Sequence, residues 1–460
     1  MKRIATDLLI ERLADWGVDT VFGLPGDGIN GIMEGLRRHA DRVRFVLVHH
    51  EEAAAFMACG YAKTTGRLGV CVATSGPGGI HLLNGLYDAK LDHQPVLAIT
   101  GMQETQLLGT GYQQEVHLEK LYQDVAAYDV MVHVPAQIPA LVDRAVRTSL
   151  AHRTVSHLTF PNDLQVAPAD EVPYEGVAPG RLPATAPTFT APPGLPRQGD
   201  LERAARVLNE GAKVVLLVGA GALGAGDEVL QVAERLASPV VKTLPGKAVV
   251  PDDHPLTTGG IGLLGTRPSE EAMEDADIRG QRQFYLSGNL ATMAPGLPYT
   301  IAAQWAHPGR QCIAFVGDGG FAMLMAELDT ACRYELPIKV VVNNNGALGQ
   351  ILWEQMVLGY PEFGVRFSRA MRFAPYASSC GALGIEVEKA GQVEEAVRAA
   401  LAHPGPALVD VMVNPDEPPM PGKVSYDQAK GFAQAFLRGQ PHKATIASTL
   451  FRDKLDQLKG

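Results

Sequence analysis

The sequence predicts an α/β protein built from three doubly wound parallel-sheet domains, and two observations carry that prediction. Short apolar runs alternate with helical patterns at Val43–Val48, Gly69–Ala73 and Pro95–Thr100, and the alternation returns at Cys312–Val316. Such alternation is typical of parallel sheets that helices cover on both faces. A stretch rich in Pro, Ala and Gly at residues 171–199 interrupts the pattern and predicts a surface linker.

These patterns divide the chain into three α/β domains, a linker and a helical tail. The expected boundaries are 1–170 (first domain), 171–199 (linker), 200–277 (central domain), 278–425 (last domain) and 426–460 (tail). The central domain has a clear strand at Lys213–Val218 but is short for a typical domain. Its acidic helix within Glu270–Gly280 runs directly into the next motif-bearing segment. We therefore expect the central and last domains to be shortened near Asp277.

Composition argues against several classes of function. The formal net charge is −10 and no long basic run occurs, which argues against nucleic-acid binding. The five cysteines are dispersed without a Cys-x-x-Cys pair, as in reduced cytoplasmic proteins. No apolar run approaches the roughly 20 residues that a bilayer span needs, and the start of the chain lacks a signal-peptide core. We therefore expect a soluble, cytoplasmic protein.

The strongest local signal lies near the start of the last domain. Gly317–Gly320 (GDGG) follows an apolar strand, a helix is expected over Phe321–Tyr334, and the strand Ile338–Val342 runs into three asparagines. A single crossover brings both strand ends to one sheet edge, so Asp318 and Asn345 should lie side by side. A carboxylate and an amide oxygen suit Mg²⁺, and glycines let the backbone approach a diphosphate. Either motif alone is more often an ordinary turn, but together they favour the functional interpretation.

This arrangement resembles the thiamine diphosphate (ThDP) motif of the pyruvate oxidase and acetolactate synthase superfamily. The resemblance implies a pyrimidine-binding first domain, a central domain of the FAD type, and a last domain that binds the diphosphate and Mg²⁺. It implies metal ligands at Asp318, Asn345 and the backbone carbonyl of Ala347. The residues that it places around the cofactor are Pro25, Gly26, Ser75, Gly76, Gly288, Asn289, Leu290, Met293, Gly319, Gly320, Gly349 and Ile351.

The indispensable carboxylate of the family maps onto Glu51, at the start of an Ala-rich helix. ThDP becomes a nucleophile when C2 of its thiazolium loses a proton to its own 4′-imino group. A glutamate bonded to N1′ of the aminopyrimidine favours that tautomer, and such acid–base work needs a partly desolvated carboxyl. Without the rest of the pattern, Glu51 and Glu52 would more simply complement the helix dipole.

Two loops of the first domain support the resemblance. Tyr112–Glu115 (YQQE) matches the family's substrate-side glutamine at Gln114, which we assign to catalysis with Glu51. Thr74–Gly79 (TSGPGG) resembles the loop that packs on the cofactor, with His81 just behind it. The residues alone leave open whether His81 belongs to the site or to the core.

One residue separates the branches of the superfamily. Pyruvate oxidases carry a glutamate five residues after the glycine that matches Gly349, whereas acetolactate synthases usually carry tryptophan there. This chain has Glu354 at that position, the third expected catalytic residue, and Trp353 one position earlier. The tail at Gln428–Ala433 also resembles quinone-linked pyruvate oxidases, but the end of the chain lacks a strong basic face, which argues against membrane docking.

The resemblance implies a ThDP- and Mg²⁺-dependent enzyme that decarboxylates a 2-keto acid such as pyruvate. Electrons would pass from the enamine through FAD to a quinone or oxygen, and one ThDP shared by two domains implies a homodimer or homotetramer. An acetolactate synthase-like carboligase stays open, as does a degenerate ThDP-binding paralogue, which the join at Asp277 favours. In relatives a loop like Gly259–Thr266 helps to hold FAD. The pattern at Gly219–Gly224 fits G-x-G-x-x-G, a weak case for a nicotinamide dehydrogenase.

Overall fold

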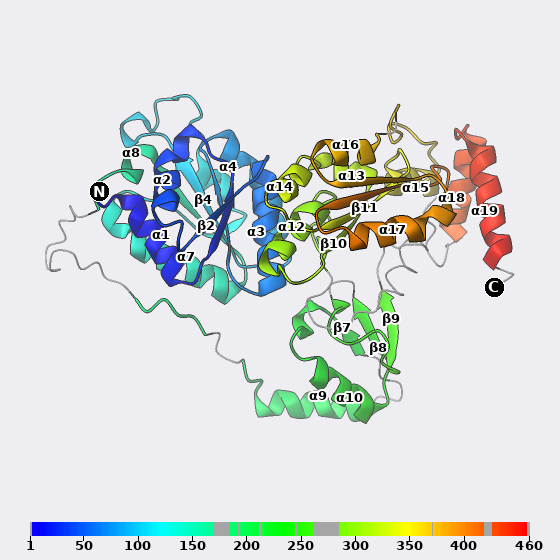
Figure 1. Ribbon diagram of the computed structural model, residues 1–460. Coiled ribbons are helices and arrows are strands. Elements are labelled where there is room, and N and C mark those ends of the chain that lie inside the picture. The colour runs from blue at the N-terminus through cyan, green and yellow to red at the C-terminus, as the bar shows by residue number, and fades with distance from the viewer. Residues whose placement is uncertain are drawn as a thin grey trace. The chain divides into compact units, whose positions relative to one another are not determined.

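The computed structural model describes most of the chain, in ranges 2–169, 185–190, 194–210, 214, 216–243, 246–261, 285–369, 371–417 and 426–457. The chain forms two compact units, whose elements are labelled in Figure 1. Unit 1 comprises Met1–Gly194, Tyr285–Ala314 and Leu324–Ile338. Unit 2 comprises Leu195–Phe284, Phe315–Met323 and Lys339–Gly460. Most of the expected linker, and the region around Asp277, lie outside the described residues.

A six-stranded sheet forms the centre of unit 1. Its strands are β1 (Thr20–Gly23), β2 (Arg44–Leu47), β3 (Gly69–Ala73), β4 (Val96–Met102), β5 (Ala126–Met131) and β6 (Val155–Pro161). They lie in the order β2-β1-β3-β4-β6-β5, and every pair is parallel. β3, β4 and β6 are buried along their whole length, as their apolar runs predict. The order reverses between β1 and β3, the place where open α/β sheets bind ligands.

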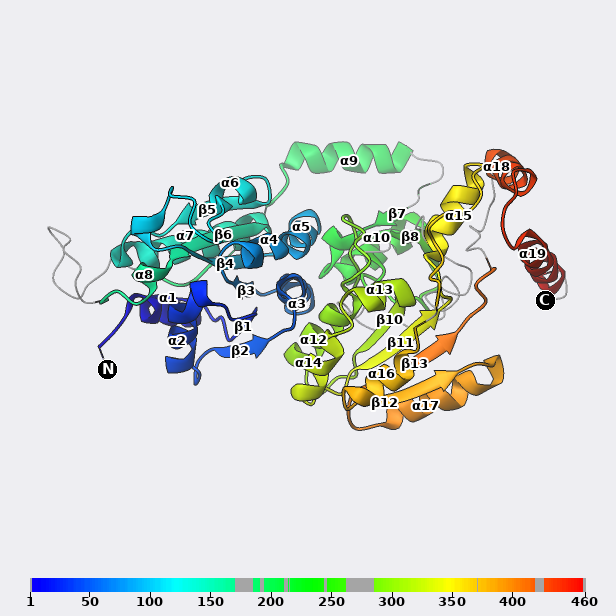
Figure 2. The same ribbon diagram turned by 90° about the horizontal axis from the view of Figure 1, so that it is seen from above.

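Helices cover both faces of this sheet. They are α1 (Ala5–Asp15), α2 (Asn30–Arg38), α3 (Glu51–Thr65), α4 (Pro77–His81), α5 (Leu83–Leu91), α6 (Leu118–Tyr122), α7 (Ile138–His152) and α8 (Asn162–Gln165). α1, α2 and α7 share one apolar cluster with the strands, and α3 and α5 pack together on the other face (Figure 2). Two helices from later in the chain, α12 (Gly296–Ala306) and α14 (Glu327–Arg333), also belong to unit 1, and α12 packs along α3. The alanines of α3 allow that close packing because they are small and fully buried.

The last domain holds a four-stranded sheet. Its strands are β10 (Ile313–Gly317), β11 (Lys339–Asn344), β12 (Leu383–Val387) and β13 (Ala407–Met412), in the order β10-β11-β13-β12. That order repeats β3-β4-β6-β5 of the first sheet, so the described strands match the first sheet without β1 and β2. β10 is therefore the edge strand among the described residues, and Phe315 on it is 68% exposed. The expected shortening of the last domain concerns the region around Asp277, which lies outside the described residues, so the shortening stays a prediction.

One helix differs from the expectation. The sequence predicts a single helix over Phe321–Tyr334, but the structure has α13 (Asp318–Met323) and then α14, separated by a turn at Leu324–Ala326. The carbonyls of this turn accept tighter i→i+3 hydrogen bonds of 3.0–3.1 Å from the first residues of α14. The sequence pattern did not reveal the break because apolar residues continue through the turn.

The central domain contains a parallel three-stranded sheet, and the chain ends in helices. The central elements are β7 (Leu216–Val218), β8 (Val240–Thr243), β9 (Thr257–Ile261), α9 (Gln198–Glu210) and α10 (Gly226–Leu236). The later helices are α15 (Gly349–Val357), α16 (Phe373–Ser379), α17 (Val393–Ala402), α18 (Tyr426–Leu437) and α19 (Lys443–Gln457). Short 3₁₀ helices lie at Asp27–Ile29, Thr105–Leu107, Pro135–Gln137, Ala220–Ala222 and Ala390–Gln392. Within the described ranges, none of the helices combines the length and apolar character that crossing a bilayer requires.

Candidate active site

Two loops meet where the strand order of unit 1 reverses. The loop after β1 contains Pro25, Gly26 and Gly28, and the loop after β3 begins at Thr74 and Ser75. The N–H of Gly28 donates to Oγ1 of Thr74 at 3.1 Å. A Cβ added at Gly26 would lie 2.5 Å from Cβ of Thr74, and one added at Gly28 would lie 2.6 Å from Oγ of Ser75. Glycine is required at both positions because the loops approach too closely for any side chain.

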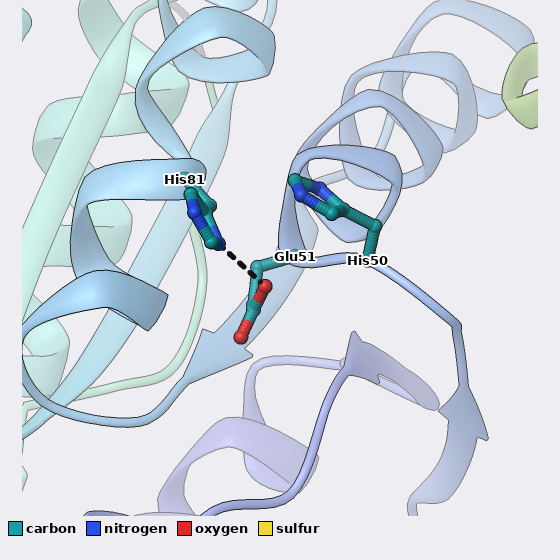
Figure 3. Close-up of side chains that lie close together, drawn as sticks. All are labelled: His50, Glu51 and His81. Carbon is teal, nitrogen blue, oxygen red and sulfur yellow. Dashed lines mark hydrogen bonds and ion pairs between the residues drawn. The ribbon is translucent and has the colours of Figure 1, made fainter. Parts of the chain in front are cut away.

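Glu51 begins α3 beside these loops. Its carboxylate is buried, with the residue 7% exposed. Nδ1 of His81, at the end of α4, lies 2.9 Å from Oε2 of Glu51 (Figure 3). The other oxygen, Oε1, faces the first turn of α4, where a Cβ added at Gly78 would be 3.3 Å away. The structure thus presents a desolvated carboxyl group with one oxygen held by an imidazole.

The histidine before Glu51 caps the same helix. Nδ1 of His50 accepts the N–H of Glu52 at 3.1 Å, so the neutral ring carries its proton on Nε2. The His50 ring stacks on that of His81, with centroids 4.6 Å apart (Figure 3). One ligand atom from each of His50, Glu51 and His81 lies within 4.8 Å of the others, a spacing that could suggest a metal site. While the cap persists, however, His50 has no free lone pair for a metal, so these residues form a hydrogen-bonding group instead.

Gln114 packs against the second loop. Its backbone φ is +61° and that of Gly76 is +59°. A Cβ added at Gly76 would lie 2.8 Å from the carbonyl oxygen of Gln114. The hydroxyl of Ser75 donates to Oε1 of Gln114 at 3.5 Å. The carboxylate of Glu115 holds this turn by accepting the N–H groups of Gly109, Gly111 (2.8 Å) and Tyr112 (3.2 Å).

The segment 287–293 also belongs to unit 1. Both oxygens of Asp92, just after α5, accept its backbone: the N–H groups of Gly288 and Asn289 each donate at 2.8 Å. Leu290 follows in a bend and is half-buried. Met293 is 48% exposed, which leaves a large apolar side chain free to contact a ligand. Four expected cofactor residues therefore share a unit with Glu51.

A buried lysine ties this segment to α3. Nζ of Lys63 donates to Oδ2 of Asp92 at 2.7 Å, to the carbonyl of Leu286 at 2.8 Å and to the hydroxyl of Tyr299 at 2.6 Å. Burial raises the pKa of the neighbouring Asp88, although Lys63 opposes that rise. Sequence reasoning missed this group because its members are far apart in the chain and each alone is typical of a solvated helix face.

Asp318 and Asn345 follow the adjacent strands β10 and β11 in the last domain. Asp318 is buried, and its Oδ2 accepts the N–H of Gly346 at 2.8 Å. Burial raises the pKa of Asp318, and Asp410 adds to the rise, although backbone N–H groups lower it. No cationic side chain pairs with it in the part of the chain that the structure describes. A buried carboxylate without a protein cation fits a divalent metal ion, which would supply the missing positive charge.

The turn after β11 contains Asn345 and Ala347, the other two candidate metal ligands. Oδ1 of Asn345 accepts the N–H of Ala347 at 3.0 Å. Ala347 bridges to Arg366, but the bonds of that bridge use the carbonyl of Gly346 and the N–H of Leu348, so they leave the Ala347 carbonyl unused. A Cβ added at Gly349 would lie 2.7 Å from Nδ2 of Asn345. Gly319 and Gly320 follow Asp318 in the first turn of α13.

Glu354 and Trp353 are neighbours in α15 but lie on different faces of the helix, one exposed and one buried. Trp353 is buried and packs on Phe432 of α18, with ring centroids 5.5 Å apart. Glu354 is exposed and accepts Nε2 of Gln350 at 3.3 Å, and Ile351 is 44% exposed. Glu354, at the position that separates the branches of the superfamily, is therefore available to a ligand, whereas Trp353 is not.

The structure gathers the expected site residues into two groups. Unit 1 holds Pro25, Gly26, Glu51, Ser75, Gly76, Gln114, Gly288, Asn289, Leu290 and Met293. Unit 2 holds Asp318, Gly319, Gly320, Asn345, Ala347, Gly349, Ile351 and Glu354. Sequence reasoning missed the capping role of His50 and the buried Glu327. The signal that could have revealed Glu327 is its place among apolar residues, where a carboxylate needs a specific partner.

The chain matches known proteins in three successive domains. Models of thiamine pyrophosphate (ThDP) enzymes match the chain: the N-terminal TPP binding domain at residues 3–121, the central domain at 201–279 and the C-terminal TPP binding domain at 270–411. The chain is 33% identical to the "Putative thiamine pyrophosphate-containing protein YdaP" of Bacillus subtilis (strain 168), over 95% of this chain and 96% of that protein. It is 27% identical to a pyruvate oxidase of Lactiplantibacillus plantarum, over 94% of this chain and 92% of the relative. An acetolactate synthase of Arthrospira platensis is also 27% identical, over 89% and 94%.

The chain therefore belongs to the thiamine pyrophosphate enzyme family, and the expected α/β fold with parallel sheets is confirmed. The alignments with the first two relatives run over 561 and 564 residues, more than the 460 of this chain. Those relatives therefore contain residues without a counterpart here. The central and C-terminal models overlap at residues 270–279, the region that contains Asp277.

Proposed function

We propose that this protein is a ThDP- and Mg²⁺-dependent enzyme that decarboxylates a 2-keto acid, with pyruvate as the substrate. The observation that carries the proposal is Glu51, a buried carboxylate beside the reversal point of a TPP-binding domain, with one oxygen held by His81. The exposed Glu354, at the position where pyruvate oxidases carry a glutamate, supports pyruvate oxidation over other reactions of the family, and the chain is similar to a pyruvate oxidase.

The residues of unit 1 would act at the aminopyrimidine and the substrate. Bound ThDP supplies a carbon that adds to the keto group and accepts the electron pair that CO₂ leaves behind. Glu51 would hold a proton at N1′ of the aminopyrimidine, and its burial limits competition from water. His81 would keep the second oxygen in place, and Gln114, held by the turn around Glu115, would face the substrate.

The residues of unit 2 would hold the diphosphate end. Asp318, Asn345 and the carbonyl of Ala347 supply three oxygen ligands, which suits Mg²⁺ because it keeps its other positions for water and phosphate. Gly319 and Gly320 present backbone without side chains next to Asp318. Ile351 and Glu354 would lie toward the substrate from the exposed face of α15.

The central domain would hold FAD. We propose that FAD bound there would supply a two-electron acceptor for oxidation of the decarboxylated product, with a quinone or oxygen as the final acceptor. A Cβ added at Gly221, in the loop that follows β7, would meet no heavy atom within 4 Å, so this loop leaves room for a ligand to approach its backbone. The visible absorption of oxidised flavin in the purified protein tests it directly.

A variant of Glu51 tests the proposed function. Glu51→Gln keeps the shape of the side chain but cannot share the proton, so release of CO₂ from pyruvate should be abolished while calorimetry shows ThDP still bound. Glu52→Gln is the matched control, since Glu52 bonds the surface residue Asn84 at 2.7 Å. Turnover of Glu51→Gln within a few-fold of wild type would refute the assignment.

A second candidate is a ThDP-binding protein without turnover. The observation in its favour is the last sheet, in which four strands are described and β10, at the edge among the described residues, exposes Phe315. Binding of ThDP and Mg²⁺ without release of CO₂ from pyruvate or other 2-keto acids would select it. Formation of acetolactate from pyruvate would instead select a carboligase.

A further inference from the structure

The turn that leads into Glu51 is held by a helix from much later in the chain. Oε1 of Glu327, the first residue of α14, accepts the N–H of His49 at 2.9 Å and that of His50 at 3.1 Å. The second oxygen, Oε2, accepts the hydroxyl of Thr330 at 2.7 Å. Glu327 is completely buried. Its carboxylate therefore binds the backbone N–H groups of the two residues that immediately precede Glu51.

The end of α14 binds Leu47, the last residue of β2, at the point where this turn begins. The N–H of Leu47 donates to the hydroxyl of Tyr334 at 2.8 Å, and Nη2 of Arg333 donates to the carbonyl of Leu47 at 3.1 Å. Between these contacts, the N–H of Val48 donates to the carbonyl of Gly23 at the end of β1. The four consecutive N–H groups from Leu47 to His50 are thus all fixed by partners outside the turn.

Burying the carboxylate of Glu327 costs free energy, which suggests that the position of the turn matters for function. Burial raises the pKa of Glu327, and hydrogen bonds from Thr330, His49 and His50 offset only part of that rise. No lysine or arginine pairs with it among the residues that the structure describes. N–H groups of a turn can be satisfied more cheaply by water or a neutral side chain. A catalytic group, however, must be held to within about half an ångström by its supporting residues.

We propose that Glu327 is a positioning residue for Glu51: by binding the N–H groups of His49 and His50, it fixes the start of α3 and with it the direction of the Glu51 carboxylate. The inference rests on the proposed function of Glu51. Glu327 follows Asp318 by nine positions, so one short segment carries both the candidate metal ligand and the support for Glu51.

The test measures activation of the cofactor without any keto acid. The readout is the rate of hydrogen–deuterium exchange at C2 of bound ThDP in the full-length protein with Mg²⁺, since that exchange depends on the aminopyrimidine that Glu51 serves. Glu327→Leu should slow the exchange by roughly tenfold to a hundredfold, because a displacement of about 1 Å can cost that much. The Kd for ThDP should change less than threefold. Glu327→Gln should restore the rate, because its amide oxygen still accepts both N–H groups.

A stability-matched control separates positioning from general destabilisation. Gln304, buried in α12 of the same unit, bonds the carbonyl of Arg310 at 2.8 Å and does not touch the turn. Gln304→Ala should lower Tm but leave the exchange rate per bound ThDP unchanged. If Glu327→Leu does not fold, Tyr334→Phe removes only the bond to Leu47 and should slow exchange by a few-fold.

The outcomes distinguish the two proposals. Wild-type exchange no faster than that of free ThDP would overturn the proposed function of Glu51, and the positioning role with it. Fast wild-type exchange that Glu327→Leu leaves unchanged, or in its place Tyr334→Phe, would overturn the positioning role alone. A loss that Glu327→Gln fails to restore would also overturn it, since the charge and not the acceptor would then matter.

Discussion

Nδ1 of His81 lies 2.9 Å from Oε2 of Glu51, although the two residues belong to helices that follow different strands. The contact forms because α3 starts after β2 and α4 starts after β3, and both begin at the same edge of the sheet. One oxygen of Glu51 is thereby committed to His81, and the other is left for a ligand.

Loss of this contact should impair catalysis more than binding. His81→Phe keeps an aromatic ring to stack on His50 but removes the N–H. Because a hydrogen bond to a charged group contributes about 1.5–3 kcal/mol, kcat for pyruvate should fall roughly tenfold to a hundredfold. The affinity for ThDP, measured by calorimetry, should stay within a few-fold. An unchanged kcat would place His81 outside the site.

Removal of Asp318 should release metal and cofactor together. Asp318→Ala deletes the buried carboxylate that a divalent ion would neutralise, so calorimetric binding of ThDP in Mg²⁺ buffer should be lost. Asn343→Ala, at an exposed position two residues before Asn345, is the control and should bind normally. Unchanged ThDP affinity in Asp318→Ala would show that the metal ligands lie elsewhere.

Glu115 should make the loop beside Gln114 sensitive to acid. The N–H of Gly109 and two further N–H groups lower the pKa of Glu115 below its ordinary value of 4.5. The stabilisation is therefore fully present above pH 4.5 and is lost as the pH falls through the lower folded-state pKa. Exchange of the Gly109 and Gly111 amides should accelerate, beyond the intrinsic pH dependence, as the pH drops through that window. In Glu115→Gln this extra acceleration should be absent.

Close packing of the two loops at the reversal point should make Gly26 intolerant of any side chain. Gly26→Ala places a Cβ 2.5 Å from Cβ of Thr74, which forces the loops apart and should cost about 1–3 kcal/mol in the free energy of unfolding. Gly221→Ala meets no atom within 4 Å and should leave stability nearly unchanged. Chemical denaturation of both variants measures their free energies of unfolding. Equal values would contradict the prediction that the loops are too close together for a side chain at Gly26.

Assembly can be tested by mixing inactive variants. If one ThDP is shared between the first domain of one protomer and the last domain of its partner, Glu51→Gln and Asp318→Ala chains should complement each other. Random reassociation makes about half of the dimers mixed, each with one intact site of two, so roughly a quarter of wild-type activity should return. Absence of recovery despite proven subunit exchange would mean that each site lies within one chain.

Much of the sheet architecture could be predicted from sequence because buried parallel strands are continuous apolar runs. The run at Gly69–Ala73 became β3 without change, and Pro95–Thr100 became β4 at Val96–Met102. The break after Met323 could not be predicted, since apolar residues continue through the turn at Leu324–Ala326. The role of Glu327 could not be predicted because its partners lie almost 280 positions earlier in the chain.

Only part of the candidate site could likewise be predicted from the sequence. Asp318 and Asn345 could be placed together because one crossover connects their strands, a local relationship that spacing alone reveals. The bond between His81 and Glu51 depends on how two separate crossovers meet, and the residues alone left His81 undecided. The tautomer of His50 could be assigned only once its bond to Glu52 was seen.

The four-stranded sheet of the last domain has a consequence for how such a chain can lose length. The three candidate metal ligands all follow β10 or β11, the two strands that a single crossover links, and this crossover lies wholly after Asp277. The ion-binding part therefore depends on two neighbouring strands of the sheet, so a change in chain length before β10 removes no ligand.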